Sequence, residues 1–452
     1  MLGWRGEWRV GLYLNVLKKI MDKKSKEFFK VLVYPGGTEI GLEVARALKP
    51  CKEVRLFSAG LSGTPADFFF ASHYNVQPVS HADWQEELKV VVEKEKITHI
   101  YPAHDDVIIP LIENQTFLEA RIVSSPLESC RIARSKSLTV QRLSGIVPAP
   151  EIFKTTKSVV NFPVFLKPDI GNGSRGVLTA RNLNQLNEAL GANPSLIIQE
   201  FLPGQEFTID CFSCRNNGVL YAQGRLRSRI TSGIASRSSF VSNPLFYSYA
   251  KKIHEAIPFH GAWFFQLKES ASGEMKIMEV APRIGGTSGL SRASGVNLPL
   301  LSLYENSGIK VAIPPSLEGV LLERTLAPVF SHNMEFNALY IDYDDTLILN
   351  GAVNSQLVKV AFQFVNLNKP VVLVTRHNGD IHSSLRKYRL EALFDKIVHL
   401  QSGESKRTAI EHTKVAFVDD SFRELEDLRL HQEVTPIHVA STDLLNEFKL
   451  KA

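Results

Sequence analysis

Short apolar runs alternate with amphipathic segments from residue 29 onward. Residues 31–34, 54–57 and 97–101 are apolar runs of strand length, and residues 39–48 carry a helical pattern. This alternation is typical of βαβ units built on a mainly parallel sheet. The turn at Gly36 and Gly37 could place a phosphate on a helix N-terminus. It lacks the G-x-G-x-x-G spacing of a dinucleotide site, which favours an ordinary tight turn.

The pattern changes twice further along the chain. Between residues 131 and 327, hairpin-like strands separated by Gly, Asn and Pro predict an α+β domain with antiparallel sheets. Residues 328–335 are expected to be a linker, and the apolar run 338–341 opens a new βαβ series. We therefore expect an α/β multidomain protein with an extension (1–28) and domains at 29–130, 131–327 and 336–452. Residues 1–20 lack the apolar core of a secretion signal and are interpreted as an upstream extension or an amphipathic helix.

Composition excludes several classes of protein. Of the 452 residues, 44% are hydrophobic and 22% charged, as in ordinary globular proteins, and no apolar run of about 18 residues could cross a membrane. A net charge of +5 without basic blocks gives no reason to expect nucleic-acid binding. Four scattered cysteines indicate a reducing, cytoplasmic location. The pair Cys211 and Cys214 has no second ligand pair nearby, so we interpret both as core cysteines rather than a zinc site.

A glycine-rich loop in the middle segment is a candidate phosphate site. A predicted strand ends at Lys167 and is followed by Gly171, Gly173, Ser174 and Gly176. The N–H groups of such a loop can fold over phosphates while the lysine supplies a positive charge. By itself the loop could equally be a tight turn. The further signals are three acids: Glu200 after an apolar strand, Glu206 after a glycine, and Glu279 on a later strand that is followed by Arg283.

This order of motifs resembles the carboxylate–amine ligase type of the ATP-grasp superfamily over residues 29–325. The resemblance implies a Rossmann-like domain ahead of an α+β ATP-grasp domain, with ATP and Mg²⁺ (or Mn²⁺) as cofactors. It assigns residues as follows: Lys136, Lys167 and Arg283 to the phosphates, the loop from Gly171 through Gly173 and Ser174 to Gly176 as a flap, Glu200, Phe201 and Leu202 to adenine, Glu206 to ribose, and Gln266 and Glu279 to magnesium. Magnesium commonly needs only one or two protein carboxylates besides phosphate oxygens.

Two positions depart from the family pattern. The family usually has Glu-x-Asn-Pro-Arg, whereas this chain has Ala281 two residues after Glu279, and Gln266 stands where a carboxylate is more common. One of two metal positions is therefore expected to be weakened. A catalytic ligase and a degenerate nucleotide-binding domain are both compatible with this.

Arginines in the same segment are candidates for substrate binding. Arg225, Arg227 and Arg229 alternate along a predicted strand and should share one face. With Arg292 in a flanking loop, Arg225 and Arg227 are suited to bidentate capture of a substrate carboxylate or phosphate. A solvated strand face is the equally weighted alternative.

Three strands of the last segment each end in chemically active side chains. Asp342 and Asp344 follow residues 338–341, Thr375 ends the run 371–375, Asp419 and Asp420 end the run 415–418, and Lys406 lies between the last two strands. The carboxyl ends of such strands are where α/β sheets bind ligands. Of the first two acids, one can act as nucleophile and the other as general acid and base.

These motifs resemble the haloacid dehalogenase (HAD) superfamily over residues 336–452. The resemblance implies a doubly wound phosphatase domain in which Asp342 attacks phosphorus and Asp344 protonates the leaving group. It places Thr375 and Lys406 at the phosphoryl oxygens and Asp342, Asp419 and the Asp344 carbonyl at Mg²⁺, with Asp420 assisting. About thirty residues separate successive motifs, which leaves little or no room for a cap domain.

The leading hypothesis is a bifunctional enzyme. An ATP-dependent ligase would join a small-molecule carboxylate to an amine, and a fused phosphatase would hydrolyse a related phosphoester, with a homodimer expected by resemblance only. The alternatives are a phosphatase regulated by a nucleotide-sensing ATP-grasp domain, and a nucleotide-binding assembly or signalling module.

Overall fold

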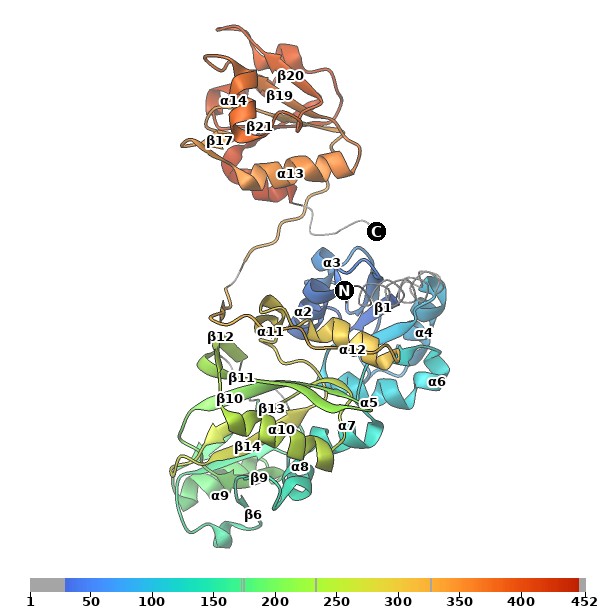
Figure 1. Cartoon of the computed structure of the whole chain (residues 1–452), viewed down its shortest axis with the longest axis vertical. Coiled ribbons are helices and arrows are strands. Elements are labelled where there is room, and N and C mark those ends of the chain that lie inside the picture. The colour runs from blue at the N-terminus through green and yellow to red at the C-terminus, as the bar shows by residue number, and fades with distance from the viewer. Residues whose placement is uncertain (1–28, 172, 174, 232–233, 326, 447–452) are drawn as a thin grey trace, which may run out of the picture. The chain divides into compact units, whose positions relative to one another are not determined.

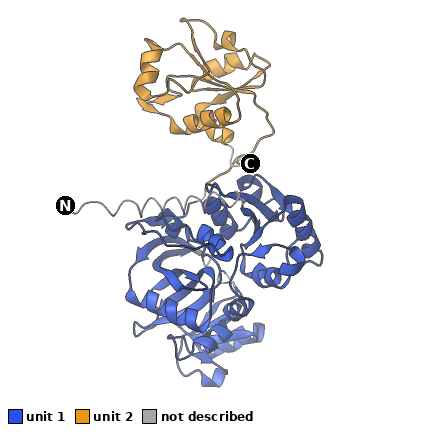
Figure 2. Cartoon of the chain, turned by 45° about the vertical axis from the view of Figure 1, so that its right-hand side comes forward, with its two compact units in different colours: residues 1–326, 451–452 blue, residues 327–450 orange. Residues whose placement is uncertain are grey.

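The structure, a computed structural model, describes residues 29–446 except 172, 174, 232, 233 and 326. The predictions for the N-terminal extension and for Ser174 fall outside these residues. The chain divides into two compact units, which we call unit 1 (up to residue 326) and unit 2 (residues 327–450), coloured separately in Figure 2. Each unit is described by itself.

Unit 1 begins with a five-stranded parallel sheet in the order β3-β2-β1-β4-β5. Figure 1 draws this first part of the chain, including β1 and α2, in blue. Side chains along β1 alternate between two cores, with Val31 and Val33 in one and Leu32 and Tyr34 in the other, so helices cover both faces. The strands are β1 (Phe29–Tyr34), β2 (Val54–Gly60), β3 (His73–Asn75), β4 (His99–Pro102) and β5 (Arg121–Ile122). The helices are α2 (Glu39–Leu48), α3 (Ala66–Phe69), α4 (Trp84–Glu95), α5 (Asp105–Glu113) and α6 (Gln115–Leu118).

The tight turn before α2 explains its two glycines. A Cβ on Gly36 would lie 2.6 Å from the Ser58 Cβ, and one on Gly37 would lie 2.5 Å from the Thr64 hydroxyl. The Thr38 hydroxyl then caps α2 by accepting a hydrogen bond from Gly41 N–H at 3.0 Å. Close packing therefore accounts for the glycine pair.

The rest of unit 1 is built on two antiparallel sheets. A four-stranded sheet has the order β6-β9-β7-β8, and a six-stranded sheet has the order β14-β13-β10-β11-β12-β15. The strands are β6 (Ile152–Phe153), β7 (Val164–Pro168), β8 (Leu178–Ala180), β9 (Leu196–Glu200), β10 (Glu206–Cys214), β11 (Gly218–Thr231), β12 (Ile234–Val241), β13 (Gly261–Glu269), β14 (Met275–Ala281) and β15 (Leu321–Glu323). The helices are α7 (Leu127–Arg134), α8 (Lys136–Leu143), η1 (Thr156–Ser158), α9 (Leu183–Ala192), α10 (Pro244–Ala256), α11 (Gly289–Ala293) and α12 (Leu298–Asn306).

One face of the six-stranded sheet packs on an aromatic core that includes Phe246 of α10 and Trp263 of β13. Because strand side chains alternate, the opposite face is free to carry polar groups. Cys211 and Cys214 are buried, unpaired strand residues of β10, as predicted. No helix among the described residues has the length and apolar character needed to cross a bilayer.

Unit 2 is a five-stranded parallel sheet in the order β20-β19-β16-β21-β22, with a small antiparallel hairpin of β17 and β18. Its strands are β16 (Ala338–Ile341), β17 (Ile348–Leu349), β18 (Ala352–Val353), β19 (Val371–Thr375), β20 (Lys396–His399), β21 (Val415–Asp419) and β22 (Val434–His438). Its helices are α13 (Ser355–Asn366), α14 (Ile381–Tyr388), η2 (Lys406–Ala409), α15 (Phe422–Leu428) and η3 (Val439–Leu445). Residues 342–370 are all described and hold only the hairpin, one helix and turns. There is no inserted cap domain within them.

Candidate functional sites

The polar face of the six-stranded sheet in unit 1 collects the side chains predicted for catalysis. Gln266 on β13 lies opposite Glu279 on β14, and on its other side it lies opposite Thr208 on β10. Thr208 in turn lies opposite Arg225 on β11. Residues paired across strands point to the same face, so these side chains form one row above the sheet.

A cavity of about 300 Å³ covers this face. Five cationic side chains and two carboxylates line it, so positive charge dominates. They are Lys136, Lys167, Arg175, Arg227, Lys268, Glu206 and Glu279. We call this space the nucleotide cavity.

Two lysines, half-buried Lys136 and buried Lys167, enter the nucleotide cavity from the other elements. Lys136 begins α8, and its ammonium donates to the carbonyl oxygens of Asp169 at 3.1 Å and Gly171 at 3.2 Å. Lys167 on β7 is 5% exposed, and its ammonium donates to the Met278 carbonyl at 3.4 Å. Burial, reinforced by the nearby Lys136 charge, lowers the pKa of Lys167 to about 8. Both lysines can therefore bind an anion in the nucleotide cavity.

Glu279 is the carboxylate that faces these lysines. Burial and the neighbouring Asp105 raise its pKa, while Arg283 and the two lysines oppose the rise. No hydrogen bond or ion pair joins its carboxylate to another side chain within the part of the chain that is described. A carboxylate without a partner in a cationic cavity fits a magnesium ion that shares phosphate oxygens.

Arg227 bridges two residues that the resemblance had given separate roles. Its guanidinium forms an ion pair with Glu206 and donates to the Gln266 amide oxygen at 3.1 Å. Glu206 also lies 3.8 Å from the Lys268 ammonium. The predicted ribose ligand and the predicted metal ligand are thus joined by one cation.

The predicted adenine segment lies beside this cavity rather than in its lining. The Glu200 carboxylate accepts hydrogen bonds of 2.7 and 2.9 Å from Lys276. Leu202 is buried, and Phe201 is half-buried between β9 and β10. The charge of Glu200 is therefore already matched by a lysine.

The predicted flap lies between β7 and β8. Gly171 and Gly173 line the nucleotide cavity, as does Arg175. Gly173 and Gly176 have φ angles of +60° and +70°, which favour glycine. A Cβ on Gly176 would also approach Pro168 Cγ to 3.2 Å.

A second cavity of about 740 Å³ adjoins the nucleotide cavity, and we call it the acceptor cavity. The two cavities share lining residues, which are Gly173, Arg175, Arg227, Gln266 and Glu279. Its far wall comes from the parallel sheet domain and includes Thr38, His104 and Asp105. The two cavities are thus continuous at Glu279.

Arg283 is held at this junction by Asp105, the first residue of α5. Its Nε donates to Asp105 Oδ1 at 2.6 Å, and its Nη2 forms a second bond to the same carboxylate. Although burial opposes it, Arg283 holds the pKa of Asp105 below its usual value. Asp105 and Arg283 lie 178 residues apart in the sequence, and the fold brings them together.

Arg225 contradicts the alternative of a solvated strand face, because its side chain is buried. It is 2% exposed and forms a bidentate ion pair with Asp210, at 2.9 and 3.0 Å. It also bonds Thr287 and lies under Gly285, where a Cβ would meet Arg225 Nη2 at 2.5 Å. Asp210 therefore neutralises the charge of Arg225, and the bond to Thr287 supports the loop after β14.

A third predicted anion ligand, Arg292, lies on α11 rather than in a loop and is ion-paired with Glu43 of α2 at 2.7 Å. It lines a separate cavity of about 860 Å³ with Arg46, Arg229 and Arg324. The strand alternation of Arg225, Arg227 and Arg229 is broken by a bulge between the last two. That irregularity explains why Arg229 lines a different cavity from Arg227.

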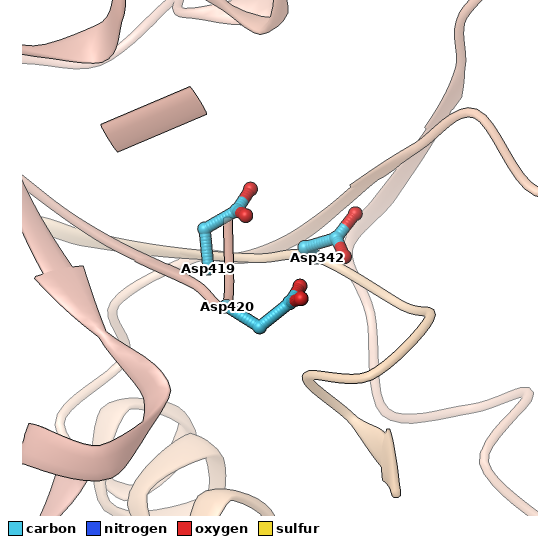
Figure 3. A group of neighbouring side chains, drawn as sticks. All are labelled: Asp342, Asp419 and Asp420. Atoms are coloured by element: carbon cyan, nitrogen blue, oxygen red, sulfur yellow. The ribbon is translucent and has the colours of Figure 1, made fainter. Parts of the chain in front are cut away.

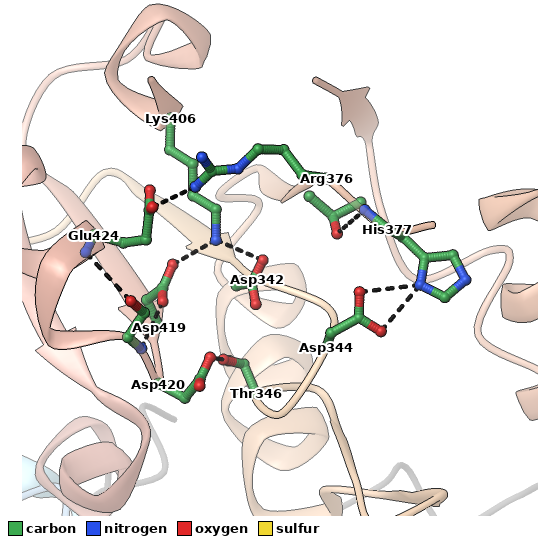
Figure 4. Close-up of polar contacts among 11 residues, drawn as sticks. Asp342, Asp344, Thr346, Arg376, His377, Lys406, Asp419, Asp420 and Glu424 are labelled. Atoms are coloured by element: carbon green, nitrogen blue, oxygen red, sulfur yellow. Dashed lines mark hydrogen bonds and ion pairs between the residues drawn. The ribbon is translucent and has the colours of Figure 1, made fainter. Parts of the chain in front are cut away.

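In unit 2, Lys406 connects two of the predicted carboxylates (Figure 4). Its ammonium donates to Asp342 Oδ1 at 2.6 Å and to Asp419 Oδ2 at 2.7 Å, and all three residues are buried. Burial raises the pKa of Asp342 to about 7, and Asp419 adds to the rise while Lys406 opposes it. The two carboxylates in turn raise the pKa of Lys406 against the effect of burial.

Three carboxylates gather at the ends of β16 and β21 (Figure 3). Oxygen atoms of Asp342, Asp419 and Asp420 lie within 4.8 Å of one another. The Thr346 hydroxyl donates to Asp420 at 3.0 Å and so orients it. Such an oxygen-rich group suits Mg²⁺. Thr375 is buried at the end of the neighbouring strand β19, and its hydroxyl accepts from His377 N–H at 3.0 Å.

Two contacts around this site were not anticipated from the sequence. Asp344 is bound by the His377 imidazole, whose Nδ1 lies 2.9 and 3.0 Å from its two oxygens. Arg376 forms an ion pair with Glu424 of α15. Both Arg376 and His377 directly follow the predicted phosphate-binding Thr375, and that adjacency was the available signal.

Comparisons with known proteins concern the fold of unit 1. A family model described as "ATP-grasp in the biosynthetic pathway with Ter operon" matches residues 192–324. A biotin carboxylase from Campylobacter jejuni in complex with β,γ-ATP has a TM-score of 0.55 at 15% identity, covering 64% of this chain and 73% of its own. Unit 1 has the ATP-grasp fold.

Two further structures share the ATP-grasp fold. Carboxyaminoimidazole ribonucleotide synthase from Aspergillus clavatus, complexed with ATP, has a TM-score of 0.54 at 15% identity, covering 64% of this chain and 79% of its own. The biotin carboxylase domain dimer of Hydrogenobacter thermophilus 2-oxoglutarate carboxylase, with MgADP and bicarbonate, has a TM-score of 0.53 at 16% identity, covering 63% and 71%. No curated protein matches the chain. The family-model match lies within unit 1, and the HAD resemblance of unit 2 stays a prediction.

Proposed function

We propose that unit 1 is an ATP- and Mg²⁺-dependent carboxylate–amine ligase. The observation that carries the proposal is the nucleotide cavity, where half-buried Lys136 and buried Lys167 face the Glu279 carboxylate. A cavity with this charge balance suits a polyphosphate that brings its own divalent cation. Nucleotides with or without magnesium are bound by the structural neighbours of the same fold.

Each residue group has a distinct task in this proposal. Lys136 and Lys167 bind phosphate oxygens, the loop at Gly171 and Gly173 closes over them, and Glu279 holds Mg²⁺. When bound, Mg²⁺ neutralises charge that develops on the transferring phosphoryl group. Arg283 faces the junction of the two cavities, where its fixed charge stabilises a developing anion.

The reaction would proceed through an acyl phosphate. A substrate carboxylate oxygen attacks the γ-phosphorus and the bond to ADP breaks. An amine then attacks the acyl carbon, phosphate leaves, and the amine loses a proton. The acceptor cavity adjoins Glu279, so it is the space in which acid and amine would meet the γ-phosphate.

We further propose that unit 2 is a Mg²⁺-dependent phosphomonoesterase of the HAD type. The specific observation in its favour is Lys406 between Asp342 and Asp419, beside three clustered carboxylates. The Asp342 carboxylate would attack phosphorus and break the ester bond, and Asp344 would protonate the departing oxygen. Asp344 would then take a proton from water, whose attack on phosphorus releases phosphate and regenerates Asp342. Lys406 and Thr375 would bind phosphoryl oxygens.

One experiment tests both activities. Wild type, Lys167→Ala and Asp342→Asn chains are incubated with ATP, Mg²⁺, bicarbonate and a pool of metabolite acids, amines and phosphoesters, and nucleotide and metabolite masses are followed together. We expect ADP formation that Lys167→Ala abolishes, and a condensed product that stays phosphorylated in Asp342→Asn.

Other outcomes separate the alternatives. Tight ATP binding without ADP release, with phosphoester loss dependent on Asp342, would favour a phosphatase regulated by a nucleotide sensor. Loss of neither ATP nor any phosphoester would favour a nucleotide-binding assembly module.

A further inference from the structure

Gln266 occupies the strand position beside Glu279, but its amide oxygen is already engaged. It accepts the hydrogen bond from Arg227 Nη1 at 3.1 Å, and the same guanidinium is ion-paired with Glu206. Arg227 is 8% exposed at its side chain, so its position is well defined by packing. A divalent ion on the Gln266 oxygen would lie within a few ångströms of a fixed positive charge, and Coulomb repulsion opposes that arrangement.

The protein ligands for a second ion are also missing. Gln266 is neutral, and position 281, where the ATP-grasp pattern has asparagine, is a buried alanine. Of the facing residues Gln266 and Glu279, only Glu279 contributes a carboxylate, and the other carboxylate that lines the nucleotide cavity, Glu206, is ion-paired with Arg227. One magnesium ion can be held by a single carboxylate with phosphate oxygens and water, whereas two ions here would share that one side chain.

The charge of Arg227 lies where it can act on the phosphates of a bound nucleotide. It lines the nucleotide cavity together with Lys136, Lys167 and Glu279, and it also lines the acceptor cavity. Glu206 and Gln266 hold the guanidinium before any ligand arrives, so it needs little reorganisation when charge develops nearby. Arginine is always charged and binds phosphate oxygens well.

We propose that the ATP site of unit 1 takes a single divalent cation, at Glu279, and that the Arg227 guanidinium supplies the positive charge of a second cation. Gln266 is then a positioning residue for Arg227 rather than a metal ligand. The inference rests on the proposed ATP site. Arg227 would then balance phosphate charge there, and the departures at Gln266 and Ala281 would both follow from the loss of the second metal ion.

Manganese electron paramagnetic resonance on the full wild-type chain tests the ion count. Mn²⁺ and the non-hydrolysable analogue AMP-PNP are added, and the signal that depends on nucleotide is isolated by difference. We expect an isolated Mn²⁺ spectrum with ³¹P coupling. Two ions about 3.5–4 Å apart would give a spin-coupled spectrum, and that result would overturn the proposal. Mn²⁺ bound in unit 2 adds only a signal that does not require nucleotide.

Variants test the role of the Arg227 charge. Arg227→Met should raise the Kd for Mn²⁺·AMP-PNP by at least about tenfold, whereas Arg227→Lys should stay within about threefold of wild type. Arg181→Met is the matched control, because Arg181 is exposed just after β8 and lines neither cavity. Unchanged affinity in a folded Arg227→Met chain would overturn the inference.

Failure of the underlying site gives a different result. Absence of any nucleotide-dependent manganese signal in wild type would refute the ATP site of unit 1 and this inference with it. A spin-coupled pair would refute the inference alone and leave the ligase proposal standing.

Discussion

The Lys406 ammonium donates a 2.6 Å hydrogen bond to the Asp342 carboxylate, and both side chains are buried. Removing either partner leaves the other as an unpaired charge in the protein interior, which is unfavourable. Lys406, 64 positions away in the sequence, therefore favours the ionised form of Asp342.

Lys406→Met should lower the phosphatase rate by at least about 100-fold, the usual cost of losing one preorganised donor at a reacting anion. Release of phosphate from p-nitrophenyl phosphate measures the rate, and circular dichroism verifies the fold. Lys414→Met is the matched control, because Lys414 is exposed and forms its ion pair with Glu335. Retention of more than a tenth of the activity in folded Lys406→Met would contradict the role.

Metal-free unit 2 should become less stable as pH rises from about 4 to 7. Burial raises the pKa of Asp342 to about 7, so the folded state prefers the protonated carboxyl, and ionisation costs stability as pH approaches that value. The slope for one proton is at most about 1.4 kcal/mol per pH unit. Urea unfolding in EDTA measures it.

Magnesium should remove this pH dependence, because a bound cation favours the ionised carboxylates. The control is Asp342→Asn, whose unfolding free energy should change less with pH than that of wild type. An equal slope in the two proteins would show that Asp342 is not the titrating group.

ATP binding to unit 1 should take up about half a proton at pH 8. In the protein without ATP, the pKa of Lys167 is about 8, so about half of the molecules carry a neutral Lys167 amine at pH 8. Phosphate oxygens of bound ATP would raise this pKa, because they favour the ammonium form. Calorimetric binding in buffers of different ionisation enthalpy measures the uptake, which should vanish near pH 6.5. Uptake that persists in Lys167→Met would assign the proton to another group.

Arg225→Ala should destabilise unit 1 by about 3–5 kcal/mol, because it leaves the buried Asp210 carboxylate unpaired. The double variant Asp210→Leu/Arg225→Met should recover part of the loss, since no uncompensated charge remains. Urea unfolding measures both. Wild-type stability in Arg225→Ala would mean that the arginine serves a ligand instead.

Alternating apolar and helical patterns were sufficient to place several elements. Helix α2 (Glu39–Leu48) and strand β16 (Ala338–Ile341) begin and end where the sequence predicts. Binary patterning and turn residues are local properties, so they can be recognised without knowing the fold. The same locality allowed Asp342 and Asp419 to be placed at strand ends, where a parallel sheet brings them together.

Which charges are available to a ligand was decided only by the tertiary structure. Arg225 and Arg227 are equivalent along the strand, yet one is buried against Asp210 while the other lines the nucleotide cavity. Asp105 and Arg283 are 178 residues apart in sequence and form a bidentate ion pair. The sequence by itself determined the elements and the residue types at their ends. Pairing between distant residues depends on burial and on charges brought together by folding, and no local pattern records either.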